Sequence, residues 1–134
     1  YGVGAKELVG YLNRVREPFN VNRFAQEAAL AALTDTEHIQ RSRELNRAGK
    51  DQLYRAFETM GLDYLPSEAN FILFATPYPA RDLFKALQRR GVIVRPADIF
   101  GLPNHIRVTV GTPEQNQRFI RALQEVLAGW QGNQ

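Results

Sequence analysis

The sequence predicts an α+β fold, with a small, mostly antiparallel sheet of about three or four strands covered by helices and preceded by further helices. Two observations lead to this prediction. Residues 1–33 show only helix-type periodicity, whereas residues 62–134 alternate short apolar runs with helix-type segments. A long polar helix connects the two regions, and we therefore divide the chain into residues 1–33 and residues 34–134.

The first region contains two predicted helices. In residues 5–16, Leu8, Tyr11, Leu12 and Val15 follow the spacing i, i+3, i+4, i+7, which is typical of an amphipathic helix. Pro18 ends this pattern, because the residue before a proline avoids helical geometry. An alanine-rich segment at residues 22–33 predicts the second helix.

The connecting helix has clear signals at both ends. Thr34 and Glu37 have the spacing of a capping box, which places a helix start at Thr34. The apolar periodicity continues to Met60, and Gly61 follows as a left-handed C-terminal residue.

The remaining segments alternate between strands and helices. Strands are predicted at residues 62–65, 70–75, 92–96 and 106–110, and helices at residues 79–91 and from Pro113 onward. Thr112, Pro113 and Gln115 give the last helix an N-cap, an N1 proline and a capping-box partner. The side chains of Phe71, Phe74 and Phe84 are expected in the core.

The composition excludes several classes of protein. The 134 residues include no cysteine, so disulfides and thiolate sites are ruled out, and the chain fits a reducing, cytoplasmic environment. No apolar run approaches the roughly 20 residues of a transmembrane helix. His38 and His105 lack metal-ligand spacing, so we expect no metal site.

Two arginines stand in strands whose other face is aliphatic. Val92 and Val94 alternate with Ile93 and Arg95, and Arg107 lies between Ile106 and Val108. If the aliphatic faces pack on helices, both guanidinium groups emerge on the opposite face. Such a pair would bind a phosphate or a carboxylate.

The pattern leaves a structural alternative open, in which each arginine pairs with an acidic side chain such as Glu68, Asp98 or Glu114. No self-contained catalytic set accompanies the arginines. Lys6 begins a helix with nothing to desolvate its amine, so it is interpreted as a surface lysine. A reactive group would therefore have to come from elsewhere.

Four runs of sequence resemble, in the same order, the C-terminal part of the histidinol-phosphate aminotransferase family. They are RVREPFNVNRFAQEAALAALTDTEH, EANFILF, GVIVRP and HIRVTVGTPEQNQRFIRAL, and the resemblance covers essentially the whole chain. This family belongs to the fold-type I pyridoxal-phosphate enzymes. The resemblance implies that residues 1–33 are the helical end of the large pyridoxal-phosphate-binding domain and residues 34–134 the small C-terminal domain.

The resemblance also implies a function and a site. The expected reaction transfers an amino group between histidinol phosphate and 2-oxoglutarate through pyridoxal phosphate, in a homodimeric parent enzyme. Arg107 matches the family arginine that binds the anionic end of the substrate, and Arg95 matches a second arginine near the phosphate. The roles of Asn20, Asn22 and Asn70 stay open.

The resemblance implies that the Schiff-base lysine of the family lies before the start of this chain. The resemblance therefore implies that the chain contains no catalytic residue, that it is inactive alone, and that it binds no cofactor by itself. Its expected contribution is the clamp for the substrate anion.

Other functions remain alternatives. Threonine-phosphate decarboxylases and certain aromatic aminotransferases share this layout, and the first also handle a phosphorylated substrate. A small basic nucleic-acid-binding module would fit the element order and the net charge of +3. The chain lacks the aromatic signature strand of RNA binders, so neither nucleic acid nor membrane is expected as a partner. A plain interaction domain would leave Arg95 and Arg107 paired internally.

Overall fold

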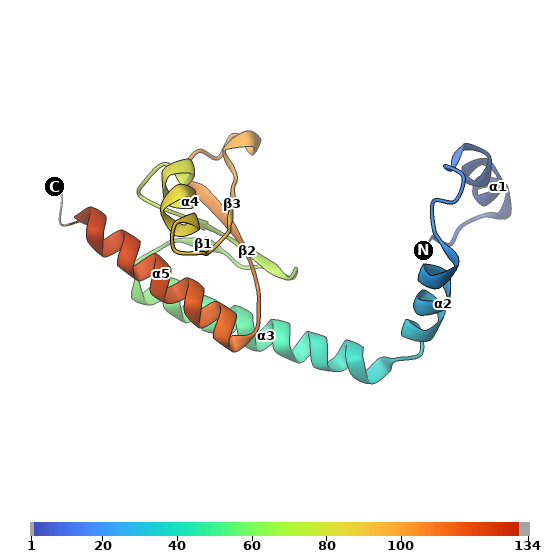
Figure 1. Cartoon of the computed structure of the whole chain (residues 1–134), viewed down its shortest axis with the longest axis horizontal. Coiled ribbons are helices and arrows are strands. Elements are labelled where there is room, and N and C mark those ends of the chain that lie inside the picture. Colours follow the sequence, from blue (N-terminus) through green and yellow to red (C-terminus); the bar gives the residue numbers. More distant parts are fainter. Residues whose placement is uncertain (1, 132–134) are drawn as a thin grey trace. The chain divides into compact units, whose positions relative to one another are not determined.

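The structure, a computed structural model, describes residues 2–131, which form two compact units that divide between Ile39 and Gln40 (Figure 1). The first unit contains α1 (Lys6–Val15), α2 (Arg23–Ala32) and the first residues of α3 (Thr36–Thr59). Both helices predicted in this region are confirmed. The second unit contains the rest of α3 and all strands.

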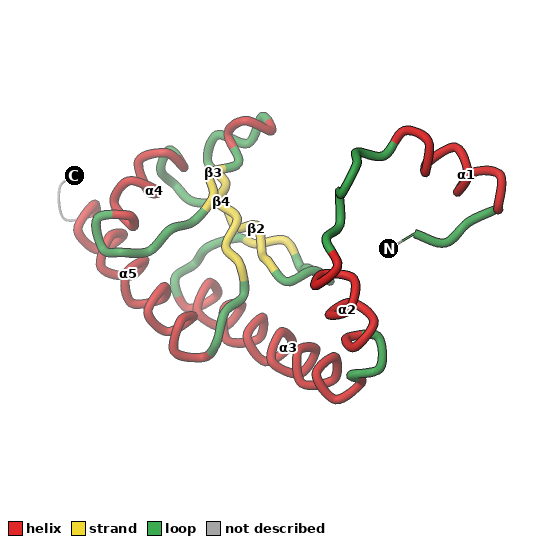
Figure 2. The backbone as a smooth tube through the Cα atoms, turned by 45° about the vertical axis from the view of Figure 1, so that its right-hand side comes forward, coloured by secondary structure: helices red, strands yellow, loops and turns green. Residues whose placement is uncertain are grey.

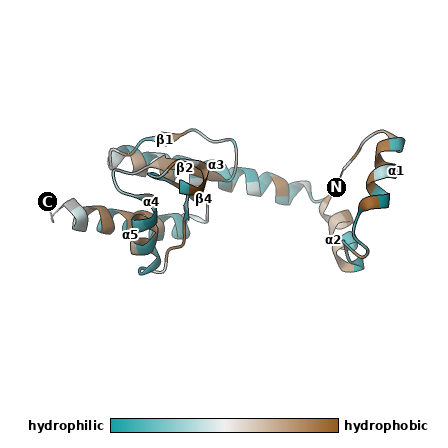
Figure 3. Cartoon of the chain, turned by 90° about the horizontal axis from the view of Figure 1, so that it is seen from above, coloured by the Kyte–Doolittle hydropathy of each residue, from teal (hydrophilic) through white to brown (hydrophobic). Residues whose placement is uncertain are grey.

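The helices of the first unit expose their apolar residues. Neither α1 nor α2 contains a buried residue in the part of the chain that the structure describes. The side of α1 formed by Leu8, Tyr11, Leu12 and Val15 is more than half exposed at each position. Figure 3 shows hydrophobic residues among hydrophilic ones along both helices. These helices are thus amphipathic, as the periodicity predicts, but they form no core of their own.

The N-cap of α3 differs from the predicted one by one residue. The carboxylate of Asp35 accepts a hydrogen bond from the backbone N–H of His38 at 2.9 Å, so Asp35 is the N-cap. The Thr34 hydroxyl instead donates to the carbonyl of Ala31 at 3.0 Å. The predicted capping box at Thr34 is therefore wrong, because the Thr34 hydroxyl bonds a backbone carbonyl at the C-terminal end of α2. Both Thr34 and Asp35 are residue types that cap helix N-termini, and in the structure the carboxylate of Asp35 is the cap.

The second unit is a four-stranded antiparallel sheet with helices against it. In addition to α3 it contains β1 (Tyr64–Leu65), β2 (Phe71–Ala75), α4 (Ala80–Gln88), β3 (Arg95–Pro96), the short 3₁₀ helix η1 (Asp98–Phe100), β4 (His105–Thr109) and α5 (Pro113–Gln131). The strand order is β1-β2-β4-β3, and every neighbouring pair is antiparallel. The predicted fold class is confirmed.

The edge strands are shorter than predicted. In β3 only Arg95 and Pro96 pair with β4, although the apolar run begins at residue 92. The N–H of Val92 bonds the carbonyl of Leu87 at 3.0 Å and so closes the end of α4, with Gly91 at φ +72°. The first residues of the run therefore cap the preceding helix. The N–H of Leu62 caps α3 through Phe57 in the same way, with Gly61 at φ +66° as predicted.

The core lies between one face of the sheet and the helices α3, α4 and α5 (Figure 2). Phe57 of α3 stacks on Phe74 of β2 with ring centroids 4.6 Å apart, and Phe119 of α5 meets both rings edge-on. Leu83 and Leu87 of α4 are also fully buried. Among the described residues, no helix is long and apolar enough to cross a membrane.

The connection from β4 to α5 is fixed by a buried polar contact with α3. Asn116 accepts a hydrogen bond from the N–H of Gly111 at 2.8 Å and donates to Gln52 at 3.3 Å. Gly49 faces this connection, where a Cβ atom would overlap the side chain of Val110. The predicted capping box of α5 is present: Thr112 and Gln115 exchange hydrogen bonds of 2.9 and 3.3 Å.

Replacing Phe57 by alanine should destabilise the second unit strongly. Phe57 is fully buried, and truncations of this kind cost about 3–5 kcal/mol because they remove apolar burial and leave a cavity. Phe100 is 68% exposed, so Phe100→Ala should change the free energy of unfolding by less than about 0.5 kcal/mol. Urea denaturation of both variants measures the difference. Equal stability of Phe57→Ala and the wild type would contradict the described core.

Candidate anion-binding site

Arg95 and Arg107 lie side by side on one face of the sheet. They are direct register partners between β3 and β4, and the same row continues through Leu73 of β2 to Leu65 of β1. Directly opposed residues in antiparallel strands project to the same side with their Cβ atoms about 4.5–5.5 Å apart. The structure thus brings together the two arginines that the sequence singles out.

Burial of the opposite face is what directs these side chains outward. Val94, Ile106 and Val108 are buried against the helices, whereas Ile93 is 79% exposed. A strand alternates its side chains, so Arg95 and Arg107 must face away from the helices. The alternation that the sequence predicts for both strands is confirmed.

Neither arginine forms an ion pair with a carboxylate of the described residues. Of the acidic side chains that could have paired with them, Asp98 is bonded to Arg81 of α4 at 2.5 Å. Glu68 and Glu114 are exposed and make no ion pair with either guanidinium. The structure therefore does not support the alternative of internal pairing within residues 2–131.

The arginine pair borders two cavities. The larger one, of about 620 Å³, is also lined by Thr109 and by Arg81 and Lys85 of α4. The smaller one, of about 270 Å³, lies against Phe71, Phe100 and Leu102. Open space next to two guanidinium groups without ion pairs leaves room for an anion, and an anion there would offset the repulsion between the two positive charges.

The aromatic ring of Phe71 lies against Arg107. The guanidinium carbon is 5.0 Å from the ring centroid, which is within the range of a cation–π interaction. The prediction that Phe71 belongs to the core is wrong. It shares its face of β2 with Leu73, opposite to the buried Ile72 and Phe74. The alternation of β2 carries the signal that would have placed Phe71 beside Arg107.

Two further cationic residues of the cavity wall were not predicted. Arg81 and Lys85 come from α4, and the position of this helix relative to the edge of the sheet cannot be read from the sequence. The ion pair of Arg81 with Asp98 ties η1 to α4, directly after β3. Asp98 is the acidic residue nearest to Arg95 in the sequence, and its carboxylate is paired with Arg81 instead.

The site can bind an anion, but the described residues show no set that could carry a reaction alone. No group of three or more His, Cys, Asp or Glu side chains could hold a metal ion within the described part of the chain. Each guanidinium offers donors in a planar fork that matches two oxygens of a phosphate or a carboxylate. The chemistry that the geometry supports is therefore recognition of an anionic group.

Comparison with known proteins identifies the family. The family described as Aminotransferase class I and II matches residues 1–123. The chain belongs to this family. A histidinol-phosphate aminotransferase from Symbiobacterium thermophilum is 57% identical over 127 residues, which is 95% of this chain and 35% of the relative. The chain thus spans about a third of the length of the curated relatives it matches.

Solved structures of aminotransferases and a decarboxylase share the fold. The histidinol-phosphate aminotransferase from Clostridium acetobutylicum superposes with a TM-score of 0.82 at 25% identity and covers 90% of this chain and 38% of that one. The L-threonine-O-3-phosphate decarboxylase from Porphyromonas gingivalis gives a TM-score of 0.76 at 27% identity, over 94% of this chain and 40% of that one. The resemblance that the motifs predict is confirmed at the level of the family.

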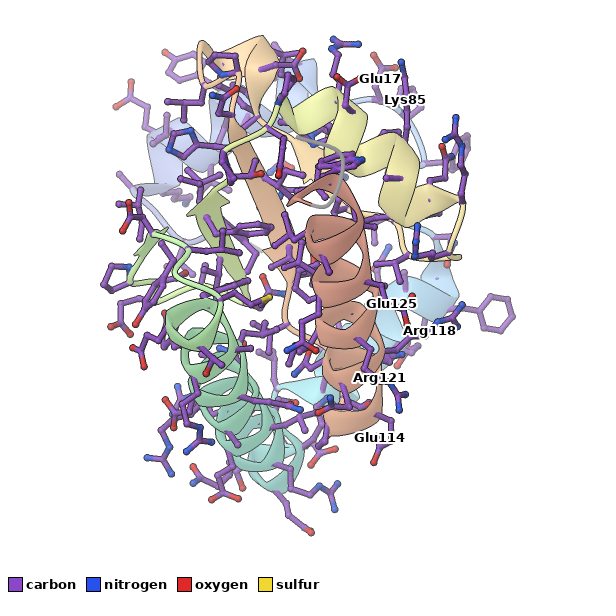
Figure 4. The ribbon with its side chains drawn as sticks, turned by 90° about the vertical axis from the view of Figure 1, so that its left-hand side faces the viewer. Glu17, Lys85, Glu114, Arg118, Arg121 and Glu125 are labelled. Atoms are coloured by element: carbon purple, nitrogen blue, oxygen red, sulfur yellow. The ribbon has the colours of Figure 1, made fainter. Side chains whose placement is uncertain are left out.

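Replacing Arg107 by glutamine should weaken binding of inorganic phosphate to this chain. We expect a loss of about tenfold or more in affinity, because a charge-assisted hydrogen bond contributes about 1.5–3 kcal/mol. Arg121→Gln on the outer side of α5, labelled in Figure 4, is the matched control and should bind as the wild type does. Calorimetric titration at low salt measures both. Unchanged phosphate affinity in Arg107→Gln would show that the arginine pair is not the binding site.

Proposed function

We propose that this chain is the C-terminal part of a histidinol-phosphate aminotransferase, in which Arg107 and Arg95 bind the phosphate of the substrate. The observation that carries the proposal is the register pairing of two arginines without a carboxylate partner, next to open space. The identity of 57% to a relative named for this activity supports the substrate. The parent enzyme would transfer an amino group between histidinol phosphate and 2-oxoglutarate.

The domain organisation follows from the same proposal. Residues 1–33 would be the helical end of the large domain, and residues 34–134 the small domain. The exposed apolar residues of α1 support this, because a helix with an amphipathic pattern requires a surface to cover that pattern. The small domain has a core of its own.

The residues of this chain do not by themselves fit pyridoxal phosphate. An aminotransferase needs a lysine amine in a desolvated pocket to hold this cofactor. Lys6 is exposed at the start of α1, and Lys85 is exposed on α4. Lys50 donates to the carbonyl of Ser67 at 2.5 Å and thereby holds a loop against α3. The lysine would therefore lie in the remaining two thirds of the parent, and the cofactor would supply the electron sink.

The contribution of this chain would be orientation. A phosphate held by two guanidinium groups fixes the distal end of the substrate and so restricts where its amino-bearing carbon can lie. Two cations also match the charge of a phosphate monoester better than one. The arginine pair would thus favour phosphorylated amines over amines that lack the anion.

A threonine-phosphate decarboxylase is the second candidate. The structural match to such an enzyme covers 94% of this chain, and its substrate also carries a phosphate that two arginines could bind. The same site geometry serves both reactions. The high identity to histidinol-phosphate aminotransferases favours the transferase.

The surface charges do not favour nucleic acid as a partner. A nucleic-acid interface needs basic residues gathered into a patch or a stripe. Along α5, Arg118 and Arg121 lie between Glu114 and Glu125 (Figure 4). Glu125 is also paired with Arg90 at 3.2 Å. We further propose that the parent acts in the cytoplasm as a homodimer, in line with its family resemblance.

Kinetics of the complete parent enzyme test this function. Arg107→Gln should raise the KM for histidinol phosphate by about 10- to 100-fold, because the substrate loses charge-assisted hydrogen bonds to its phosphate. Glu125→Gln, on the outer side of α5, serves as the control variant. An enzyme that releases carbon dioxide from threonine phosphate but does not transfer an amino group would support the decarboxylase instead. An unchanged KM in Arg107→Gln would contradict the clamp.

A further inference from the structure

We propose that Phe71 is a positioning residue that holds the guanidinium of Arg107 in the orientation required for binding phosphate. This inference rests on the proposed function of the arginine pair and adds a residue to it. Phe71 lies on β2, so the arginine pair would depend on three neighbouring strands.

The sheet register brings Phe71 to Arg107. Phe71 is paired with Thr109, and Arg107 is paired with Leu73, so the two side chains are diagonal neighbours on the same face. Diagonal positions are about 7–8 Å apart, within reach of an aromatic ring and a long side chain. The observed separation of 5.0 Å between guanidinium carbon and ring centroid shows that they meet.

The geometry of a guanidinium makes this contact compatible with phosphate binding. Its N–H groups lie in the plane of the fork, whereas an aromatic ring interacts with the face of that plane. A ring on the face therefore leaves the donors along the edge free. Without such a support, a long arginine side chain samples several rotamers and must lose that freedom on binding. Repulsion from Arg95 would also push Arg107 away.

The surroundings strengthen the contact. Phe71, Phe100 and Leu102 line the smaller cavity on one side of the arginine pair. These apolar side chains make that side of Arg107 less polar, and electrostatic interactions are stronger in a less polar environment. The polar residues Thr109 and Lys85 lie at the larger cavity. We therefore place the phosphate at the larger cavity and the aromatic support at the smaller one.

Phe71 is well suited to a role other than stability. It is 36% exposed, and it lies on the face of β2 opposite to the fully buried Ile72 and Phe74. A large apolar side chain that does not belong to the core can be replaced with little effect on folding. A change in substrate binding can then be separated from a change in stability.

The experiment uses the complete parent enzyme with Phe71→Leu, Phe71→Tyr and a control. Phe71→Leu should raise the KM for histidinol phosphate by about three- to tenfold with kcat nearly unchanged, because the cation–π contact is lost. Phe71→Tyr keeps an aromatic ring, so its KM for histidinol phosphate should equal that of the wild type. Leu65→Ala removes another exposed apolar side chain from the same face of the sheet and should have no effect on KM.

A double-mutant cycle with Arg107→Gln decides whether Phe71 acts through Arg107. If it does, Phe71→Leu has no further effect on KM in the Arg107→Gln background. A full effect in that background would overturn the proposal. An unchanged KM in Phe71→Leu alone would overturn the role of Phe71 while leaving the arginine clamp in place. An unchanged KM in Arg107→Gln would overturn the clamp and the positioning role together.

A spectroscopic measurement on this 134-residue chain guards against misfolded variants. The side-chain N–H signal of Arg107 should shift upfield by the ring current of Phe71, and Phe71→Leu should abolish that shift. The dispersion of the backbone amide signals reports the fold in the same spectrum. An Arg107 signal that is the same in both proteins would overturn the contact.

Discussion

The antiparallel pairing of β3 with β4 is the interaction on which the candidate site depends. It places Arg95 opposite Arg107, and burial of Val94, Ile106 and Val108 forces both arginines to the other face. A shift of the register by one residue would turn an arginine into the core, which the apolar face opposes strongly. Because β3 is only two residues long, neighbouring contacts must hold it. The N–H of Ala97 bonds the carbonyl of His105 at 2.9 Å and extends the pairing beyond the strand.

The elements around the pair leave both guanidinium groups available. Gly91 and Val92 end α4, and the chain then enters β3 at Arg95. Arg81 forms an ion pair with Asp98, which is the first acidic residue after Arg95 in the sequence. Asp98 therefore does not pair with Arg95. On the other side, the ring of Phe71 covers Arg107 without offering it a hydrogen-bond acceptor. The sheet face therefore combines two cations with apolar neighbours, which is a suitable surface for a phosphate.

Much of this arrangement is predictable from the sequence, because it rests on local patterns. The alternation in β3 and β4 predicts the face of each arginine, and Gly61 and the Thr112–Gln115 box mark helix ends correctly. What sequence reasoning missed depends on tertiary packing. Arg81 and Lys85 reach the cavity because of where α4 lies beside the sheet. Asp35 replaces Thr34 as the cap because the Thr34 hydroxyl is bonded to the carbonyl of Ala31 at the end of α2. Phe71 lies outside the core because strand alternation puts it on the face of β2 opposite to Ile72 and Phe74.

We propose that the reactive groups of the parent enzyme lie outside this chain. The proposed role of the chain is to hold the distal phosphate of the substrate while those groups act. A crystal structure of the complete parent with a phosphorylated substrate analogue tests this role most directly. The account predicts phosphate oxygens about 3 Å from the guanidinium nitrogens of both Arg95 and Arg107. A phosphate bound by other residues, with both arginines directed away from it, would contradict the account.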